Sequence, residues 1–372
     1  MEAIRYILFA LLLFVQPFYG MADEPSEFPI IADIMHTNLY YSIRFRDIHR
    51  AGFNACLCRC DTEQEIENVL SVAKTYDIKL IIFSYPIVNH PEKVVPTIKD
   101  HPSMWQYYLM DEPGVRHLEK LQDVQKQIAR YDRNAKFYIN LLPNSSKDAL
   151  NLMGVEKYPE YLKAFSTIPQ PQISYDYYPV LKNGKQGSKW YSILDDIREE
   201  SQRTGRPFWA YVLCVPHFIY PMPTIGHLRL QCYINLAYGA QGIQYFSYST
   251  PKPTEQYDFH DGPLLRNGEK SNTYYLVQKM NAELKPVASL FWHSTVTDIK
   301  HRKCIDGEVV VSHFQKDGKR YTCFVNKSAE DNVTVTLRPS DYAWRVRKDL
   351  KAESVKSRYT LSAGDILILM NK

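Results

Sequence analysis

Two adjacent acids, Asp111 and Glu112, follow an aromatic and apolar run at positions 104–110 and precede Pro113. The run is typical of a buried strand, and Pro113 cannot continue the hydrogen bonds of a sheet, so the strand should end at the acids. Acids at the end of a core strand are candidates for chemistry, because burying a carboxylate costs free energy. Burial and the charge of Asp111 would raise the pKa of Glu112, as a general acid requires. The alternative is a plain strand end at which an acid caps the following helix.

The segments that would position these acids alternate between strand-like and helix-like patterns. The predicted strands are residues 30–36, 53–60, 78–85, 105–110, 136–142, 172–178, 207–215 and 242–248. Helical patterns lie between them, such as the one that follows a capping box from Thr62 to Glu65. Eight strand-helix units within about 250 residues predict a (β/α)8 barrel.

The chain beyond the barrel has a different pattern. Short alternating segments are found at residues 309–314, 321–325, 333–337, 344–347 and 366–370. Asp317-Gly318 is a hairpin signal between the first two. We therefore predict a barrel over residues 23–293 and a small antiparallel β-sandwich over residues 294–372.

The N-terminus has the features of a cleavable signal peptide over residues 1–22. Arg5 gives a basic start, residues 7–15 form a short apolar run, and Gly20-Met21-Ala22 suits cleavage after Ala22. The run is shorter than the ~20 residues that a membrane-spanning helix needs. The sequence thus predicts a periplasmic or secreted protein with no membrane anchor after cleavage.

Composition narrows the possible partners. The net charge is only +4, and the acidic and basic residues are interspersed, which argues against a nucleic-acid partner. The chain has seven cysteines, and Cys56, Cys58 and Cys60 alternate along one predicted strand, where small buried side chains are the simplest interpretation. Cys304 and Cys323 could pair, but the sequence predicts no particular disulfide. It leaves the oligomeric state open.

In a (β/α)8 barrel the working groups lie at the carboxyl ends of the strands. Besides Asp111 and Glu112, the candidates there are His36, Tyr85, Asn140, Asp176, Tyr178, Trp209, His217 and Tyr245, with Asp258 in the loop after the last strand. Carboxylates and amides bond hydroxyl groups, and aromatic rings cover the faces of sugars. No phosphate-binding loop, cofactor motif or metal-ligand spacing is present. The set suits a neutral carbohydrate and the hydrolysis of a glycosidic bond by carboxyl groups.

The pattern resembles clan A glycoside hydrolases through its eight units, Asp111-Glu112-Pro113 on the fourth strand and the β-rich C-terminal region. The segment Ser174-Tyr-Asp-Tyr-Tyr-Pro179 also looks like the sixth strand of that clan. The chain resembles barrel enzymes of the family-42 β-galactosidase type and exported bacterial proteins related to them. This resemblance implies that Glu112, with Asp111 in the position of the clan's Asn, is the acid/base residue.

One departure from the clan concerns the nucleophile, which the resemblance places as a Glu at the end of the seventh strand. Residues 207–217 contain no carboxylate. Three alternatives remain. Asp176 could act as the base for a water molecule, which would need a separation of ~6.5–9.5 Å from Glu112 and would predict inversion. The loop after strand eight could supply Glu255, Asp258 or Asp261. The protein could instead bind glycans without cleaving them.

Overall fold

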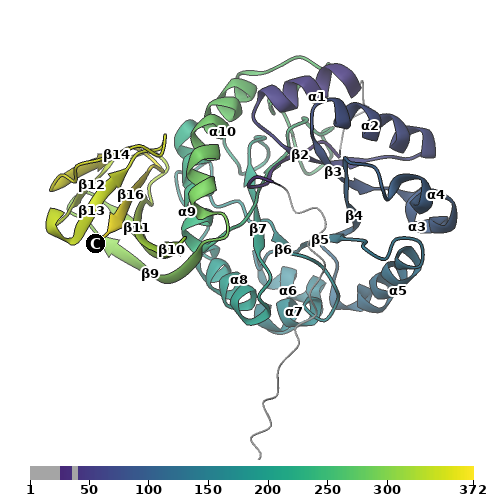
Figure 1. Ribbon diagram of the computed structural model, residues 1–372, viewed down its shortest axis with the longest axis horizontal. Helices are drawn as coiled ribbons and strands as arrows, with labels where there is room; N and C mark the ends of the chain where they lie inside the picture. The colour runs from purple at the N-terminus through teal and green to yellow at the C-terminus, as the bar shows by residue number, and fades with distance from the viewer. Residues whose placement is uncertain (1–25, 36–40) are drawn as a thin grey trace, which may run out of the picture.

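The computed structural model describes residues 26–35 and 41–372 and contains a closed barrel of eight parallel strands (Figure 1). The strands follow one another in sequence order, and β1 closes the ring by pairing with both β2 and β8. They are β1 (Ile30–Asp33), β2 (Ala55–Arg59), β3 (Lys79–Phe83), β4 (Met104–Asp111), β5 (Phe137–Leu141), β6 (Ile173–Tyr175), β7 (Phe208–Leu213) and β8 (Ile243–Phe246). The predicted (β/α)8 barrel is confirmed.

Helices connect the strands and surround the barrel (Figure 1). They are α1 (Tyr41–Arg50), α2 (Glu63–Thr75), α3 (Tyr85–Asn89), α4 (Pro91–Ile98), the 3-10 helix η1 (Val115–His117), α5 (Leu118–Ala129), α6 (Lys147–Met153), α7 (Tyr158–Phe165), α8 (Trp190–Thr204), α9 (Ile225–Tyr238) and α10 (Asn272–Phe291). The predicted capping box starts α2, because the Thr62 hydroxyl accepts the N–H of Glu65 and the Glu65 carboxylate accepts the N–H of Thr62.

Side chains on the barrel strands alternate between the inside of the barrel and the helix layer. On β1, Ile31 belongs to the apolar cluster inside the barrel, whereas Ile30 and Ala32 belong to the core between strands and helices. This alternation places Asp33, the last residue of β1, on the inner side with Ile31. The first strand was predicted to run to His36, and it ends at Asp33 instead.

The cysteines have the simple role that the sequence indicated. Cys56, Cys58 and Cys60 are fully buried in the core between β2 and the helices. All seven cysteines, including Cys304 and Cys323, are free thiols. The structure therefore contains no disulfide among its described residues.

The C-terminal region forms two antiparallel sheets. Its strands are β9 (Thr295–Lys303), β10 (Glu308–Lys316), β11 (Lys319–Asn326), β12 (Val333–Thr336), β13 (Tyr342–Val346), β14 (Ala352–Glu353), β15 (Arg358–Leu361) and β16 (Ile366–Asn371). Six of them form one sheet, and β12 pairs with β15 in the other. Val311 and Phe324 of the large sheet share a buried cluster with Val335 and Tyr359 of the small one, so the sheets pack face to face.

The opposite face of the large sheet packs on the barrel through α9, which lies between the two parts of the molecule (Figure 1). Nearly every residue of α9 is buried, including the polar Gln231 and Asn235, so burial is not confined to one stripe. Such a helix is expected where both of its faces are covered by protein. The sandwich is thereby fixed beside the barrel wall, and its Lys327 carbonyl oxygen also accepts the Gln186 amide N–H from the loop after β6.

The predicted signal peptide, residues 1–22, lies outside the described residues. Within residues 26–35 and 41–372, no helix has the length and apolar character needed to cross a membrane.

Candidate active site

Glu112 directly follows β4 in a backbone conformation that few residues adopt. Its φ angle is +43°, in the left-handed region that disfavours side chains with a β-carbon. Its N–H donates to the Asn140 carbonyl oxygen at 2.9 Å, which ties the turn to β5. Strained residues persist only where their surroundings enforce them, and they are common at functional sites.

The surroundings that hold this turn come from α6 and α7. The Tyr161 hydroxyl donates to the Pro113 carbonyl oxygen at 2.7 Å and accepts the N–H of Leu142 at 3.1 Å, so one side chain fixes the chain after both β4 and β5. Gly114 is required by close approach, because a β-carbon there would collide with the Leu152 carbonyl oxygen. The two acids are thus presented by a turn that is clamped on two sides.

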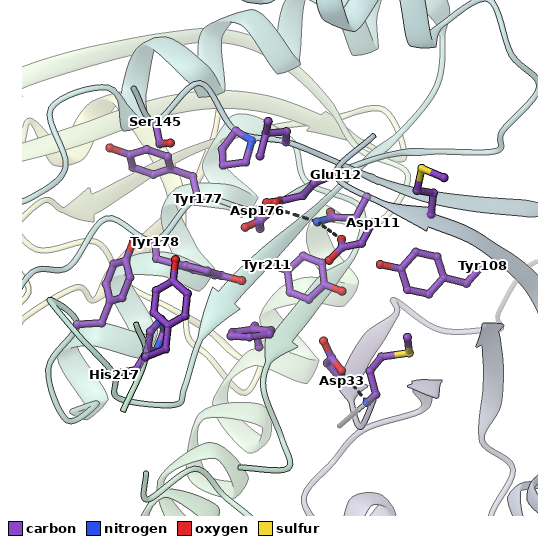
Figure 2. Close-up of a pocket in the computed structure, with 18 of the residues that line it drawn as sticks. Asp33, Tyr108, Asp111, Glu112, Ser145, Asp176, Tyr177, Tyr178, Tyr211 and His217 are labelled. Carbon is purple, nitrogen blue, oxygen red and sulfur yellow. Dashed lines mark hydrogen bonds between the residues drawn. The ribbon is translucent and has the colours of Figure 1, made fainter. Parts of the chain in front are cut away.

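Asp111, Glu112 and Asp176 form one cluster, which is organised by Asn140. The Asn140 amide nitrogen donates to Asp176 Oδ1 at 2.8 Å and to Asp111 Oδ1 at 3.2 Å (Figure 2). The carboxyl groups of Glu112 and Asp176 are also hydrogen-bonded to each other. Two carboxyl groups can form such a bond only when one of them carries a proton. The cluster is therefore built to hold a proton.

The electrostatics of the cluster support the same conclusion. Burial and the charge of Asp111 raise the pKa of Glu112 to about 7, although the hydrogen bond to Asp176 opposes this shift. Burial and the charges of Glu112 and Asp111 raise the pKa of Asp176 well above its usual range, against the hydrogen bond from Asn140. The Glu112 side chain is exposed to the pocket, but protein surrounds it on its other sides. Burial therefore still raises its pKa. Near neutral pH the pair retains a proton.

A buried polar network beneath the cluster orients Asn140. The Ser174 hydroxyl donates to Asn140 Oδ1 at 3.0 Å, which turns the amide nitrogen toward the acids. Ser174 in turn accepts the Gln244 amide N–H at 2.8 Å, and Gln244 Oε1 accepts the Tyr138 hydroxyl at 2.7 Å. These side chains come from β5, β6 and β8 and fill the barrel just below the mouth. A satisfied buried network of this kind fixes one arrangement of the groups above it.

The cluster lies in a pocket of about 1220 Å³ at the carboxyl ends of the strands. One side of the pocket is aromatic: the ring of Phe246 stacks on Tyr178 with centroids 5.9 Å apart, and His217 packs on Phe259 at 4.4 Å. On the opposite side, Arg59 lies over the ring of Tyr85 at 5.5 Å. The pocket combines acids, which can bond the hydroxyl groups of a sugar, with aromatic rings, which can cover its apolar face.

The structure brings most of the predicted site residues together. Besides Asp111, Glu112 and Asp176, the pocket is lined by Tyr85, Asn140, Tyr178 and His217. His217 is buried, and its Nδ1 lies 3.0 Å from the Val215 carbonyl oxygen, while burial lowers its pKa. It is therefore a neutral wall residue of the pocket. His36 lies outside the described residues.

Trp209 and Tyr245 need correction, because neither lines the pocket. Trp209 is deep inside the barrel, where it packs on Trp105 with centroids 5.1 Å apart. Tyr245 points to the helix layer, where it is fully buried and packs on Phe53. The predicted strand ends were right to within a few residues, but the alternation along a strand sends only every second side chain toward the mouth.

The proposed loop acids and the wide spacing of Asp176 are also corrected. Asp258 Oδ1 accepts the N–H of Phe218 at 2.5 Å, and Asp261 contacts His260 at 2.9 Å; Glu255, Asp258 and Asp261 are all absent from the pocket lining. Asp176 was expected to lie ~6.5–9.5 Å from Glu112, with a water molecule between the two carboxyl groups. The two carboxyl groups are instead in direct contact. β4 and β6 flank β5, so their side chains converge on Asn140 instead of facing each other across the mouth.

Among the inward-facing residues of the pocket that sequence reasoning missed are Asp33, Tyr108 and Tyr211. Asp33 at the end of β1 was hidden because the strand was predicted to continue past it, and Tyr108 and Tyr211 were counted as core. The Tyr108 hydroxyl is hydrogen-bonded to Asp111. An acid that ends an apolar run such as Ile30-Ile-Ala was the available signal for Asp33.

The end of β7 supplies no carboxylate, as the sequence indicated. Leu213 is the last residue of β7, and Cys214 after it is fully buried among the helix-facing core residues. Burial raises the pKa of the Cys214 thiol, which disfavours the thiolate.

Within the described part of the chain, no group of three or more His, Cys, Asp or Glu side chains has the arrangement of a metal site.

Comparison with known proteins places the fold. No protein-family model matches the chain, and no curated protein matches it. A GH42 β-galactosidase from G. stearothermophilus, solved as a catalytic mutant, superposes with a TM-score of 0.65 at 8% identity, covering 93% of this chain and 98% of that one. The β-galactosidase from Bacillus circulans sp. alkalophilus gives 0.64 at 9% identity, covering 93% and 99%. The chain has the fold of these enzymes.

The β-galactosidase from the psychrophilic Marinomonas ef1 matches a smaller share of both chains. It superposes with a TM-score of 0.50 at 11% identity, covering 70% of this chain and 60% of that one. This chain therefore spans little more than half the length of that enzyme. At such low identities the similarity establishes the architecture, and the chemistry has to be argued from the site itself.

Proposed function

We propose that this protein is a glycoside hydrolase in which Glu112 is the general acid. The observation that carries the proposal is the carboxyl of Glu112, which opens into a large pocket and has a pKa raised to about 7. A general acid works best when its pKa lies near the working pH. Most glycosidases use two carboxyl groups whose different environments give them different pKa values.

Asp176 and Asp111 have different parts in this proposal. Asp176 shares the proton with Glu112 and holds its carboxyl in place, so Asp176 is a positioning residue for the proton donor. Asp111 is held by Asn140 and by the Tyr108 hydroxyl, and its charge keeps Glu112 protonated. A carboxylate at this place also suits a hydrogen bond to a sugar hydroxyl.

The pocket supports a neutral oligosaccharide or an extended glycoside as the substrate. Its volume of about 1220 Å³ exceeds the ~300–1,000 Å³ of ordinary small-molecule sites. The Tyr178 and Phe246 rings offer an apolar wall, and Tyr220 packs edge-on to Tyr178 at 5.7 Å. The β-galactosidases of similar fold make galactosides the first substrates to test.

A glycan-binding protein without hydrolytic activity is the alternative, and one observation favours it. The end of β7 has no carboxylate, so the two-glutamate retaining mechanism cannot operate with the groups found there. In that case the acids would only bond sugar hydroxyls, and glycans would bind without being cleaved.

One experiment separates the two functions. The purified protein, Glu112→Gln and Asp176→Asn are incubated with aryl glycosides and neutral oligosaccharides, and both binding and sugar release are measured. Hydrolysis by the wild type that falls about 10²–10⁴-fold in Glu112→Gln supports the enzyme. Binding without release by the wild type, or full activity of Glu112→Gln, would refute the proposed role of Glu112.

We also propose that the protein is exported and acts in the periplasm or outside the cell. The support is the pattern of residues 1–22, with a basic start, an apolar stretch and small residues before Asp23. N-terminal sequencing of the protein from fractionated cells tests this, with Asp23 expected as the first residue of the exported form.

A further inference from the structure

The acid cluster occupies only one side of the barrel mouth. Asp111 ends β4 and Glu112 follows it, Asp176 follows β6, and Asn140 on β5 joins them. A direct contact between Glu112 and Asp176 leaves no room for a water molecule or a sugar carbon between them. The hydrolysis of a glycoside needs a second group on the far side of the anomeric carbon.

Asp33 is the one other carboxylate that lines the pocket among the described residues. It ends β1, and in a closed ring of eight strands taken in sequence order β1 stands opposite β5. Its side chain faces inward with Ile31, and the residue is only 5% exposed and lines this pocket. Asp33 therefore faces the acid cluster across the barrel (Figure 2).

The position of Asp33 is fixed by its neighbours. Its Oδ1 accepts the N–H of Met35 at 2.9 Å. Its carbonyl oxygen accepts the Ser247 hydroxyl at 3.1 Å and the N–H of Tyr248 at 3.0 Å, which ties the end of β1 to the end of β8. A base has to be held within a fraction of an ångström of its working position, and these contacts supply that support.

The space between the two sides is lined by tyrosine hydroxyls. Burial raises the pKa values of Tyr108, Tyr178 and Tyr211, and the charges of Asp33 and Asp111 both raise them further. The three phenols thus lie within electrostatic range of both sides.

The separation of Asp33 and Glu112 decides which kind of carboxyl pair they form. A retaining pair stands only ~5–5.5 Å apart, with the nucleophile against the anomeric carbon. The wider ~6.5–9.5 Å of an inverting pair leaves room for a water molecule. The placement of Asp33 on β1, opposite the acid cluster in the ring of strands, favours the second case.

We propose that Asp33 is the general base that activates the hydrolytic water and that the reaction inverts the anomeric centre. This inference rests on the proposed function. The water oxygen forms a bond to the anomeric carbon while its proton passes to the Asp33 carboxylate. The glycosidic bond breaks with its electron pair on the leaving oxygen, which takes the proton of Glu112. The two carboxyl groups return to their starting states by exchanging protons with solvent.

The test compares activated and unactivated glycosides. The substrates are 2,4-dinitrophenyl and methyl glycosides of galactose, glucose, mannose and fucose in both anomeric forms, assayed with wild type, Asp33→Asn and Asp77→Asn. Asp77 is an exposed acid in the turn between α2 and β3, at the opposite end of the barrel. A base is needed whatever the leaving group, so Asp33→Asn should lose about 10²–10⁴-fold on both kinds of substrate. Asp77→Asn should match the wild type.

The stereochemistry of the wild-type product, followed by NMR during the first minutes, gives a second measurement that requires no variant. Inversion supports the proposal, and retention overturns it. Activity of a folded Asp33→Asn within threefold of wild type also overturns it, while the proposed function stands because the wild type still hydrolyses. Absence of hydrolysis by the wild type on every substrate refutes the proposed function and this inference together. If Asp33→Asn does not fold, the product configuration decides.

Discussion

At the scale of single residues, the shared proton between Glu112 and Asp176 determines how the molecule responds to pH. The folded pKa of Glu112, about 7, lies above the ordinary 4.5 of a glutamic acid. Between these values the folded chain holds a proton that the unfolded chain releases. The free energy of unfolding should therefore decrease as the pH rises through this window.

Replacing Glu112 with Gln removes this dependence, because the amide does not ionise. We expect Glu112→Gln to raise the unfolding temperature by a few degrees at pH 8 and to leave it nearly unchanged at pH 4, where the native carboxyl is neutral as well. Thermal unfolding followed by circular dichroism at both pH values measures this. Glu119→Gln, an exposed acid on α5, is the control and should show no difference between them. An equal effect of Glu112→Gln at both pH values would contradict the raised pKa.

The residue scale also shows what the sequence could predict about the site. Asp111 and Glu112 were found because an apolar run ends abruptly on them, and Asp176 because it follows another such run. Their mutual contact was not predictable, since it depends on how far β4 and β6 project beside β5. Asp33 was missed for a simpler reason: a boundary error of a few residues on β1 hid an acid that ends the strand.

At the scale of elements, α7 holds the loop after β4, which carries Glu112, and the loop after β5 beside it. The Tyr161 hydroxyl joins the Pro113 carbonyl oxygen and the Leu142 N–H, and Tyr158 on the same helix stacks near it with centroids 6.1 Å apart. The Tyr158 hydroxyl is also buried but has no hydrogen-bond partner within the described part of the chain. The two tyrosines therefore form a matched pair.

Tyr161→Phe should cost about 1–3 kcal/mol of stability, because it leaves two buried backbone groups without a partner. Activity should fall as well, since the turn with Glu112 loses its clamp. Tyr158→Phe removes a hydroxyl that has no bond to lose and should be neutral or stabilising. Urea unfolding of both variants gives the comparison. Equal losses in the two would show that the Tyr161 hydroxyl does not support the loops.

The elements themselves were largely predictable. All eight barrel strands appear in the predicted order, because buried parallel strands give continuous apolar runs that are hard to mistake. The strand β9 was missed, and its sequence Thr-Val-Thr-Asp-Ile-Lys-His-Arg-Lys explains this. It lies at the edge of its sheet and is mostly exposed, so tertiary pairing rather than an apolar pattern makes it a strand.

At the scale of the whole molecule, the sandwich and the barrel share one core. Phe314 on β10 is 1% exposed and stacks on Phe291, the last residue of α10, at 4.3 Å, and on Tyr321 at 5.1 Å. Glu283 on α10 also pairs with Arg229 at 2.7 Å and with Lys348, which follows β13, at 2.9 Å. The two parts of the molecule should therefore stabilise each other.

Phe314→Ala should lower the free energy of unfolding by about 3–5 kcal/mol, the usual cost of removing a buried aromatic ring. Trp344→Ala, on β13 at 48% exposure, is the control and should cost far less. Tryptophan fluorescence and far-ultraviolet circular dichroism measured during urea unfolding follow the two variants. A cost for Phe314→Ala no larger than that of the control would contradict a shared core.

The most direct test of the central claim is the dependence of the Glu112→Gln variant on the leaving group. A 2,4-dinitrophenolate leaves without being protonated, whereas a methoxide or sugar alkoxide needs the proton of the general acid. We predict that kcat/KM of Glu112→Gln falls about 10²–10⁴-fold on methyl glycosides or oligosaccharides and less than about tenfold on the 2,4-dinitrophenyl glycoside of the same sugar. An equal loss on both substrates, or no loss on either, would contradict the assignment of Glu112 as the proton donor.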